Sequence, residues 1–143
     1  MMIRQFTRED AEVVIALWRE CGLTRPWNDP KTDVERKLAT QPELFFVGTD
    51  ADEPGGGGTV VAAVMAGYDG HRGSINYLAV SPARQGQGLG AALLAHAEAA
   101  LRALGCPKIN LQVRPDNRAV VGFYERLGYE VYEVIDLGKR CGA

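Results

Sequence analysis

The stretch from Ser74 to Gly105 constrains the fold most, because an apolar strand leads through glycine-rich residues directly into a helix. Residues 74–80 are rich in β-branched and aromatic side chains, which favour a strand, and Pro82 ends it because proline cannot donate to the ladder. From Leu89 onward, apolar residues recur at helical spacing. The sequence therefore predicts a strand, a glycine-rich elbow over residues 85–91, and a helix.

The elbow is suited to binding a phosphate group. Gly86, Gly88 and Gly90 lack a Cβ, so a ligand can approach the backbone closely there. The first N–H groups of the following helix have no intrahelical partner, and the helix dipole adds partial positive charge to them. Arg84 adds a formal charge. The pattern indicates a phosphate or pyrophosphate site.

The same residues allow other interpretations of the elbow. Gly86, Gly88 and Ala91 match the spacing of the dinucleotide fingerprint, but residues 106–112 offer no acidic side chain to hold a ribose. No Lys-Ser or Lys-Thr pair follows the glycines, which argues against a P-loop. A tight strand-to-helix turn without a ligand stays open as the plain alternative.

At these residues the chain resembles the GNAT superfamily of acetyl-coenzyme A-dependent N-acetyltransferases. The family signature Gln/Arg-x-x-Gly-x-Gly/Ala is met by residues 85–90, Gln-Gly-Gln-Gly-Leu-Gly. The second family block is met by Asn117 and by residues 123–129, Phe-Tyr-Glu-Arg-Leu-Gly-Tyr. Residues 25–30 and 67–73 are similar to the small bacterial YpeA-type branch, so the resemblance covers nearly the whole chain.

The predicted elements follow the order β-α-α-β-β-β-α-β-α-β-β, a mixed α/β fold. The predicted strands are residues 2–6, 44–47, 59–68, 74–80, 108–113, 129–134 and 136–140. The predicted helices are residues 31–39, 89–104 and 117–127, and a first helix between a Thr7–Asp10 capping box and Gly22. Residues 50–58, with four consecutive glycines, predict a flexible hairpin loop.

The resemblance implies a mostly antiparallel sheet of six to seven strands, flanked by about four helices. Its central parallel strands, ending at Val80 and spanning residues 108–113, would splay apart and admit the cofactor between their C-terminal ends. No repeat and no second domain is visible in the sequence. Residues 1–143 are therefore expected to form a single N-acetyltransferase domain.

The resemblance also implies acetyl-coenzyme A as co-substrate. Main-chain groups of Leu78, Ala79 and Val80 would face the pantetheine arm and the thioester, freed by a bulge that suits the ambiguous alternation of this strand. Asn117 would contact the pantetheine, although asparagine also favours a simple helix cap. The pyrophosphate would lie on the elbow, whose residues are Gln85, Gly86, Gln87, Gly88, Leu89, Gly90 and Ala91.

Tyr124 occupies the family's general-acid position. A phenol with an ordinary pKa of about 10 is protonated at neutral pH and can donate to a thiolate. Tyr124 also falls on the apolar stripe of its helix, so packing is the alternative. Similar ribosomal-protein N-terminal acetyltransferases have a glutamate where this chain has Gln112, and an amide cannot act as the base. That difference leaves either no strong base or an ordered-water relay, with Asp69 and His71 as further candidates.

The sequence therefore predicts acetyl transfer to a primary amine by direct attack in a ternary complex. No cysteine stands near the motif with a basic partner, which argues against an acetyl-cysteine intermediate. Candidates for the acceptor site are Trp27, Asn28, Tyr68 and Asp69, although Trp27 equally suits a lid over the core. The alternatives are a ribosomal-protein-type N-terminal acetyltransferase and a non-catalytic acetyl-coenzyme A-binding regulatory module.

Composition limits the partners. The net charge is −2 with both signs interspersed, which indicates neither nucleic-acid nor membrane binding. No apolar run approaches the roughly 20 residues of a membrane span, and Arg4 interrupts the start, so a cytoplasmic location is expected. The three cysteines are widely spaced, which suggests neither a disulfide framework nor a metal site. Domains of this family often pair, so a homodimer is compatible with the resemblance.

Overall fold

The computed structural model describes residues 1–51 and 57–142. Within them, five strands form one sheet in the order β1-β2-β3-β4-β5. The strands are β1 (Met2–Gln5), β2 (Phe45–Thr49), β3 (Val60–Tyr68), β4 (Gly73–Val80) and β5 (Ile109–Asn110). The α-helices are α1 (Ala11–Glu20), α2 (Pro30–Ala39), α3 (Leu89–Ala103) and α4 (Arg118–Arg126). Three 3-10 turns complete the elements: η1 (Arg8–Asp10), η2 (Pro42–Leu44) and η3 (Pro82–Arg84). This confirms a mixed α/β fold with four helices.

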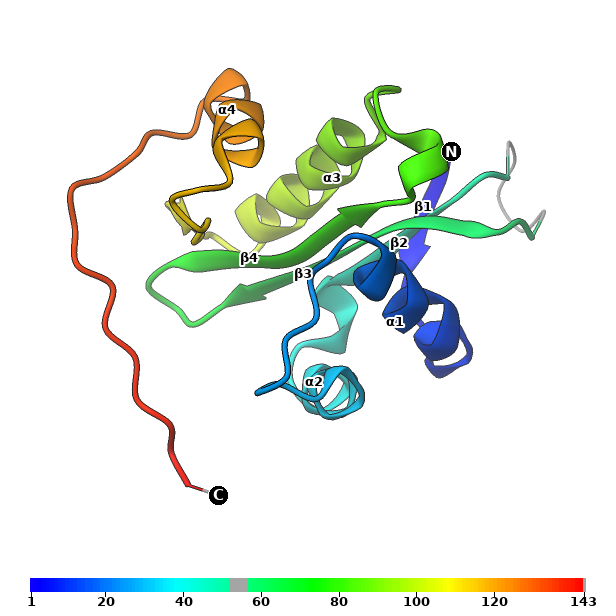
Figure 1. The fold of residues 1–143 in the computed structure, drawn as a ribbon, viewed down its shortest axis with the longest axis horizontal. Helices are drawn as coiled ribbons and strands as arrows, with labels where there is room; N and C mark the ends of the chain where they lie inside the picture. Colours follow the sequence, from blue (N-terminus) through cyan, green and yellow to red (C-terminus); the bar gives the residue numbers. More distant parts are fainter. Residues whose placement is uncertain (52–56, 143) are drawn as a thin grey trace. The chain divides into compact units, whose positions relative to one another are not determined.

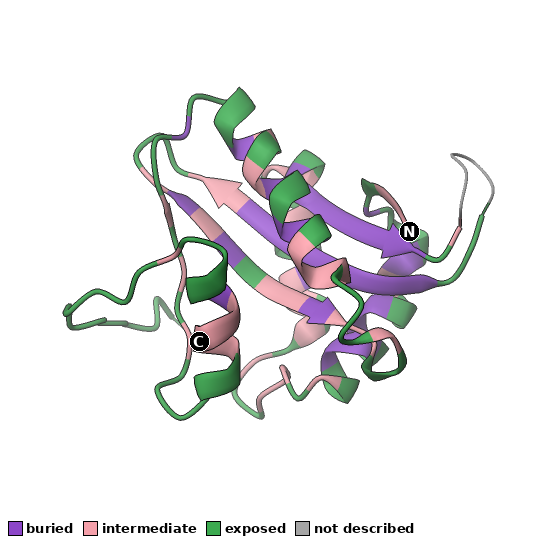
Figure 2. Cartoon of the chain, turned by 90° about the horizontal axis from the view of Figure 1, so that it is seen from above, coloured by how far each residue is buried: buried purple, intermediate pink, exposed green. Residues whose placement is uncertain are grey.

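The sheet is mostly antiparallel, as predicted. The pairs β1–β2, β2–β3 and β3–β4 are antiparallel, and β4–β5 is parallel. Helices α1 and α2 lie on one face of the sheet and α3 lies on the other (Figure 1). Strand β2 is buried throughout and β3 almost throughout, whereas β4 has several half-buried residues (Figure 2). Strand β4 is therefore the one of these three most available for contacts beyond the core.

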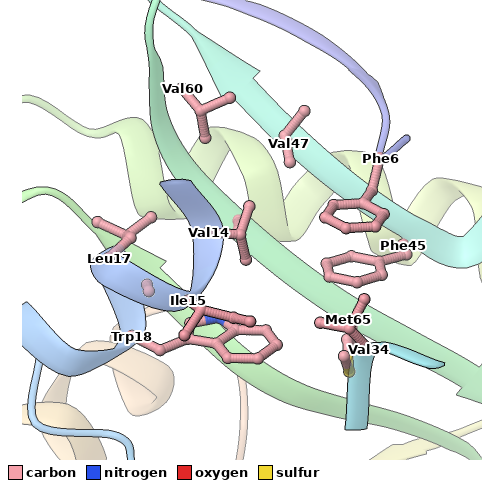
Figure 3. Packing of buried hydrophobic residues seen from close by; sticks show 12 residues of the cluster. Phe6, Val14, Ile15, Leu17, Trp18, Val34, Phe45, Val47, Val60 and Met65 are labelled. Carbon is pink, nitrogen blue, oxygen red and sulfur yellow. The ribbon is translucent and has the colours of Figure 1, made fainter. Parts of the chain in front are cut away.

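The core beneath α1 is built from stacked aromatic rings (Figure 3). Phe6 and Phe45 stack with ring centroids 4.0 Å apart, and Trp18 packs parallel to Phe45 at 6.3 Å. Burial of such side chains contributes about 1.5–3 kcal/mol each. Trp18 also stacks on Tyr77 of β4 at 4.0 Å, so the core reaches the strand that carries the predicted thioester contacts.

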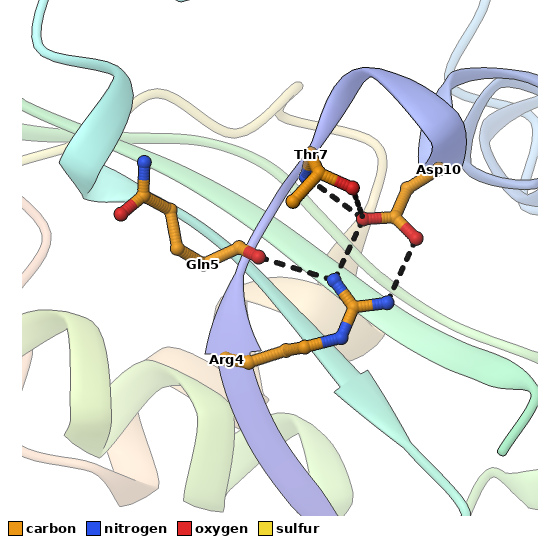
Figure 4. Close-up of polar contacts among 4 residues, drawn as sticks. All are labelled: Arg4, Gln5, Thr7 and Asp10. Atoms are coloured by element: carbon orange, nitrogen blue, oxygen red, sulfur yellow. Dashed lines mark hydrogen bonds and ion pairs between the residues drawn. The ribbon is translucent and has the colours of Figure 1, made fainter. Parts of the chain in front are cut away.

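An ion pair fixes the entry into α1 (Figure 4). The Arg4 guanidinium donates to both carboxylate oxygens of Asp10, at 2.7 and 2.8 Å. The backbone N–H of Thr7 donates to the same carboxylate at 2.8 Å, which confirms the predicted pairing of Thr7 with Asp10. The hydrogen bond from Arg4 holds the pKa of Asp10 below its ordinary value. These contacts tie β1 to the turn that precedes α1.

The two strands predicted at residues 129–134 and 136–140 are wrong. These residues form neither strand nor helix, and Val134, Ile135 and Leu137 are between 75% and 87% exposed. Their apolar alternation satisfies the sequence rule for a strand, but a strand also needs a partner for its backbone groups. The sheet therefore has five strands within the described residues, instead of six to seven.

One other boundary differs from the prediction. Strand β5 comprises only Ile109 and Asn110, so Gln112 lies outside it and is exposed. The predicted hairpin loop falls partly on residues 52–56, which lie outside the described residues. At the flanks of that loop, the Asp50 N–H donates to the Thr59 carbonyl at 3.0 Å, which agrees with the predicted antiparallel pairing.

The contacts divide the chain into two compact units, Met1–Leu111 and Gln112–Ala143. The first holds the sheet, α1, α2 and α3, and the second holds α4. The single-domain organisation stays a prediction. Within residues 1–51 and 57–142, no helix has both the length and the apolar character that crossing a membrane requires.

Candidate functional site

Strand β4 contains a bulge at Tyr77 and Leu78. Ala79 pairs with Ala63, and Asn76 pairs with Met65. Between these two pairs β4 has two residues and β3 has one. Tyr77 has a φ of 55°, which is unusual for a residue other than glycine. The bulge expected in this strand is therefore present, and it takes the main chain of Leu78 out of the ladder.

The far edge of β4 pairs with β5 over a short distance. Gly73 faces Ile109 and Ser74 faces Asn110, and the register ends there. From Ile75 to Val80, β4 continues without a strand on this edge among the described residues. Backbone donors and acceptors on an unpaired edge can bind another extended chain.

The elbow follows η3 and leads into α3, as predicted. Gly86 and Gly88 have φ values of 79° and 78°, in the left-handed region that favours glycine. A Cβ built at either position would meet no atom within 4 Å, so the space beside these glycines is open. The backbone conformation, and not close packing, requires glycine at these two positions.

The amides of the elbow are left without acceptors. Among the described residues, no carbonyl or side chain accepts a hydrogen bond from the backbone N–H groups of residues 88–91. The polar side chains nearby bond elsewhere: Gln85 Nε2 donates to the Val80 carbonyl at 3.1 Å, and Arg84 Nε donates to Gln87 Oε1 at 3.0 Å. Consecutive backbone donors at a helix N-terminus form a site suited to an anion.

A cysteine that directly follows α1 contacts the end of β4. The sequence did not indicate this contact. Cys21 Sγ donates to the Val80 carbonyl at 3.2 Å. Burial raises the pKa of the Cys21 thiol, which disfavours the thiolate. No basic side chain is hydrogen-bonded to Cys21 within the described part of the chain. The thiol therefore suits a structural contact better than a nucleophile.

The predicted acceptor residues lie in two places. Tyr68 ends β3 opposite Gly73, and Asp69 follows in the β3–β4 turn. Asn28 instead contacts Tyr77, its Nδ2 donating to the phenol oxygen at 2.9 Å. Because Tyr77 lies four positions after Gly73 along the strand, the two places are about 13 Å apart along the sheet. Trp27, beside Asn28, is 57% exposed.

Asp69 uses its carboxylate inside its own turn. One oxygen accepts the backbone N–H groups of His71 and Arg72, both at 2.7 Å. These hydrogen bonds, that of Arg72 first, lower the pKa of Asp69. Asp69 is therefore a weak base, and the turn accounts for its position.

Two residues that the sequence did not single out contact Asn28. Tyr77 donates its hydroxyl to Asp33 Oδ2 at 2.6 Å, and Asn28 Nδ2 also donates to that oxygen. Burial, followed by the hydrogen bond to Asp33, raises the pKa of Tyr77 to about 12. Asp33 and Tyr77 stand 44 positions apart in the sequence, so no local pattern could indicate their contact.

The second unit carries Tyr124 and Asn117. Tyr124 is 8% exposed, its ring meets Phe123 and Tyr129 edge to face, and burial raises its pKa to about 12. Asn117 precedes α4, but its side chain makes no capping hydrogen bond with any described residue. The cap explanation for Asn117 thus has no support from side-chain contacts.

A metal centre is not indicated by the arrangement of side chains. Within residues 1–51 and 57–142, no group of three or more His, Cys, Asp or Glu side chains is placed to hold an ion.

Comparison with known proteins agrees with these features. Residues 11–129 match the model of the acetyltransferase (GNAT) family. An acetyltransferase of Yersinia pestis (strain Pestoides F) is 53% identical over 140 residues, which cover 98% of this chain and 95% of that protein. The chain belongs to the GNAT family of acetyltransferases and is an acyltransferase.

Solved structures share the fold. AAC(6')-Iy, in complex with the bisubstrate analogue CoA-S-monomethyl-acetylneamine, superposes with a TM-score of 0.76 at 21% identity, covering 98% of each chain. The ribosomal-protein-S18-alanine N-acetyltransferase from Escherichia coli gives a TM-score of 0.69 at 25% identity, covering 89% of this chain and 76% of that one.

Proposed function

We propose that this protein transfers an acetyl group from acetyl-coenzyme A to a primary amine of a small molecule or peptide, by direct attack in a ternary complex. The run of unbonded amides in the elbow is the observation that carries the proposal. Coenzyme A contains a diphosphate, and N–H groups at a helix N-terminus stabilise such a charge. The related structure with a coenzyme A-linked bisubstrate analogue supports the same ligand class.

The edge of β4 supports a position for the pantetheine arm. This arm carries amides, and an extended amide chain can add to an unpaired strand edge through main-chain hydrogen bonds. The residues concerned are Leu78, Ala79 and Val80, with Leu78 released from the ladder by the bulge. We include in the proposal the predicted splay between β4 and the strand after Lys108, and a pantetheine contact from Asn117.

The transfer requires few groups. The amine nitrogen attacks the thioester carbonyl carbon, the C–N bond forms and the C–S bond breaks, while the nitrogen loses a proton and the sulfur gains one. The bulge in β4 supports a main-chain N–H as the group that stabilises the developing oxyanion. The raised pKa of Cys21 supports direct attack over an acetyl-cysteine.

Tyr124 is proposed as the donor to the leaving sulfur. Its pKa of about 12 keeps the phenol protonated at neutral pH. Because a thiol has an ordinary pKa of about 8.5, a phenol with a raised pKa stabilises the sulfur chiefly by a hydrogen bond while the C–S bond breaks. The base is proposed to be ordered water, because Gln112 cannot accept a proton and Asp69 is held in its turn.

The family match crosses both compact units, which supports treating residues 1–143 as one catalytic domain. The test combines calorimetric titration of acetyl-coenzyme A with a thiol-release assay over a panel of primary amines. We expect binding and amine-stimulated thiol release. Pantetheine, which lacks the diphosphate, serves as the control ligand and should bind far more weakly. Binding without release by any amine would instead indicate a non-catalytic module.

A further inference from the structure

We propose that Asn28, Asp33 and Tyr77 form the subsite that binds the acceptor amine as a cation, with the Asp33 carboxylate as its counter-charge. The bound ammonium loses one proton to the ordered water before the neutral nitrogen attacks the thioester. These three residues are called the acceptor cluster below. The inference rests on the proposed acetyl transfer and names the charge of its acceptor. It adds Asp33 and Tyr77 as specificity-determining residues.

The acceptor cluster holds one carboxylate oxygen firmly and leaves the other available. Asp33 Oδ2 accepts hydrogen bonds from the Tyr77 hydroxyl, at 2.6 Å, and from Asn28 Nδ2. Asn28 Nδ2 also donates to the Tyr77 oxygen at 2.9 Å. Both donors are neutral, so they orient the carboxylate without cancelling its charge.

The remaining oxygen has only a distant cation. Arg36 Nη1 lies 3.9 Å from Asp33 Oδ1, and the Arg36 side chain is 75% exposed whereas that of Asp33 is 19% exposed. An ion pair of this length on an exposed arginine contributes little. A carboxylate withdrawn from water gains much more from a close cation with hydrogen-bond donors. An alkylammonium group supplies both.

The acceptor cluster also lies next to the strand residues proposed to hold the thioester. Tyr77 is the bulge residue next to Leu78, so its side chain starts one residue from the main chain proposed to hold the thioester. Trp18 stacks on the Tyr77 ring at 4.0 Å, which fixes the hydroxyl in place. The cluster lies on the α1 and α2 face of the sheet, opposite α3 (Figure 1). Acceptor and diphosphate would thus approach from opposite faces.

A purely structural role makes a different prediction. If the acceptor cluster only ties α2 to β4, its loss lowers the stability and changes every substrate alike. If it binds a cation, removing the charge raises the KM for cationic amines and leaves kcat and the acetyl-coenzyme A affinity unchanged. Asp33→Asn separates the two, because asparagine keeps an oxygen acceptor for Tyr77 and Asn28.

The experiment uses the full chain with spermidine, phenylethylamine and aniline as probes. Turnover is measured by thiol release, and binding by calorimetry on the coenzyme A complex. We expect Asp33→Asn to raise the KM or Kd of the two cationic amines about tenfold or more. Aniline, which is neutral, should be unaffected. Tyr77→Phe keeps the stacking on Trp18 and should show a smaller effect of the same kind.

Glu35→Gln is the matched control, because it removes one negative charge from the same helix at an exposed ion pair with Arg8. It should leave all three probes unchanged. Equal KM and Kd values in wild type and Asp33→Asn would overturn the inference, as would a failure of both cationic amines to bind wild type. A wild type that does not bind acetyl-coenzyme A would contradict the proposed function instead, and the amine titration of the free protein would still test the cluster.

Discussion

The β3–β4 turn and the elbow look alike in sequence but differ in where their hydrogen bonds go. Both contain glycines in the left-handed region, with φ of 91° at Gly70 and 78° at Gly88, and neither glycine has an atom within 4 Å of a built Cβ. In the turn, Asp69 accepts two backbone N–H groups. In the elbow, the side chains of Gln85 and Gln87 bond elsewhere and the amides stay unbonded.

The difference shows what separates a turn from a binding site. A buried or clustered donor without an acceptor is unfavourable, so a protein supplies an acceptor wherever it can. The chain places an aspartate in the turn and none in the elbow. An external anion therefore has more to gain at the elbow than at the turn, although the backbone conformations at Gly70 and Gly88 are similar.

The largest expected effect comes from substituting the two glycines in the same way. Gly88→Val disfavours the left-handed backbone and should weaken acetyl-coenzyme A binding by about a thousandfold, since at least two charge-assisted hydrogen bonds are lost. Gly70→Val introduces the same strain in the turn and should leave the affinity unchanged. Calorimetry measures both. Equal losses of affinity in the two variants would show that the elbow and the turn do not differ in binding the cofactor.

A substitution at Tyr124 separates the turnover of the enzyme from its affinity for acetyl-coenzyme A. Tyr124→Phe should lower kcat by about a hundredfold, because the leaving sulfur loses its donor, while the Kd for acetyl-coenzyme A stays as in wild type. Tyr132→Phe, at a tyrosine that is 50% exposed, is the control. Steady-state kinetics with unchanged kcat in Tyr124→Phe would remove Tyr124 from the mechanism.

Burial of Tyr124 also predicts a loss of stability at high pH. Its pKa of about 12 lies above that of an unfolded tyrosine, so the folded state favours the protonated phenol. This contribution, about 3 kcal/mol at most, is fully present below about pH 10 and is lost as pH rises towards 12. Denaturant unfolding of wild type and Tyr124→Phe between these pH values measures it. If the free energy of unfolding changes with pH in the same way in both proteins, Tyr124 does not make this contribution.

The smallest expected effect concerns the turn. Asp69→Ala removes the acceptor for two amides and should lower Tm slightly without changing the acetyl-coenzyme A affinity. Since the pKa of Asp69 is lowered in the folded state, its contribution is present above the ordinary carboxyl pKa and is lost as pH falls through the folded value. Thermal unfolding as a function of pH compares the two proteins. A variant with weaker cofactor binding would show that the turn takes part in the site.

Local signals explain which parts of the fold were predictable. The strand ending at Val80, the elbow and the helix from Leu89 depend on residues adjacent in sequence, and the structure has them at the predicted positions. The strands predicted after Tyr129 are absent because a strand depends on a partner that its own residues do not supply. Alternation alone could not settle that point.

The same distinction holds for the candidate site. The elbow could be predicted because glycine spacing determines its backbone conformation. The contact between Asp33 and Tyr77 could not, because α2 and β4 are far apart in the sequence and meet only in the folded protein. The structure gives Asp33 two donors and little exposure, and neither follows from the residues around it in the sequence.

A crystal structure of the protein with acetyl-coenzyme A tests directly whether the backbone amides of the elbow bind the diphosphate. The account predicts the diphosphate within hydrogen-bond distance of the backbone N–H groups between Gly86 and Ala91, with the thioester beside Leu78. A coenzyme bound away from the elbow, with those amides still lacking an acceptor, would contradict it.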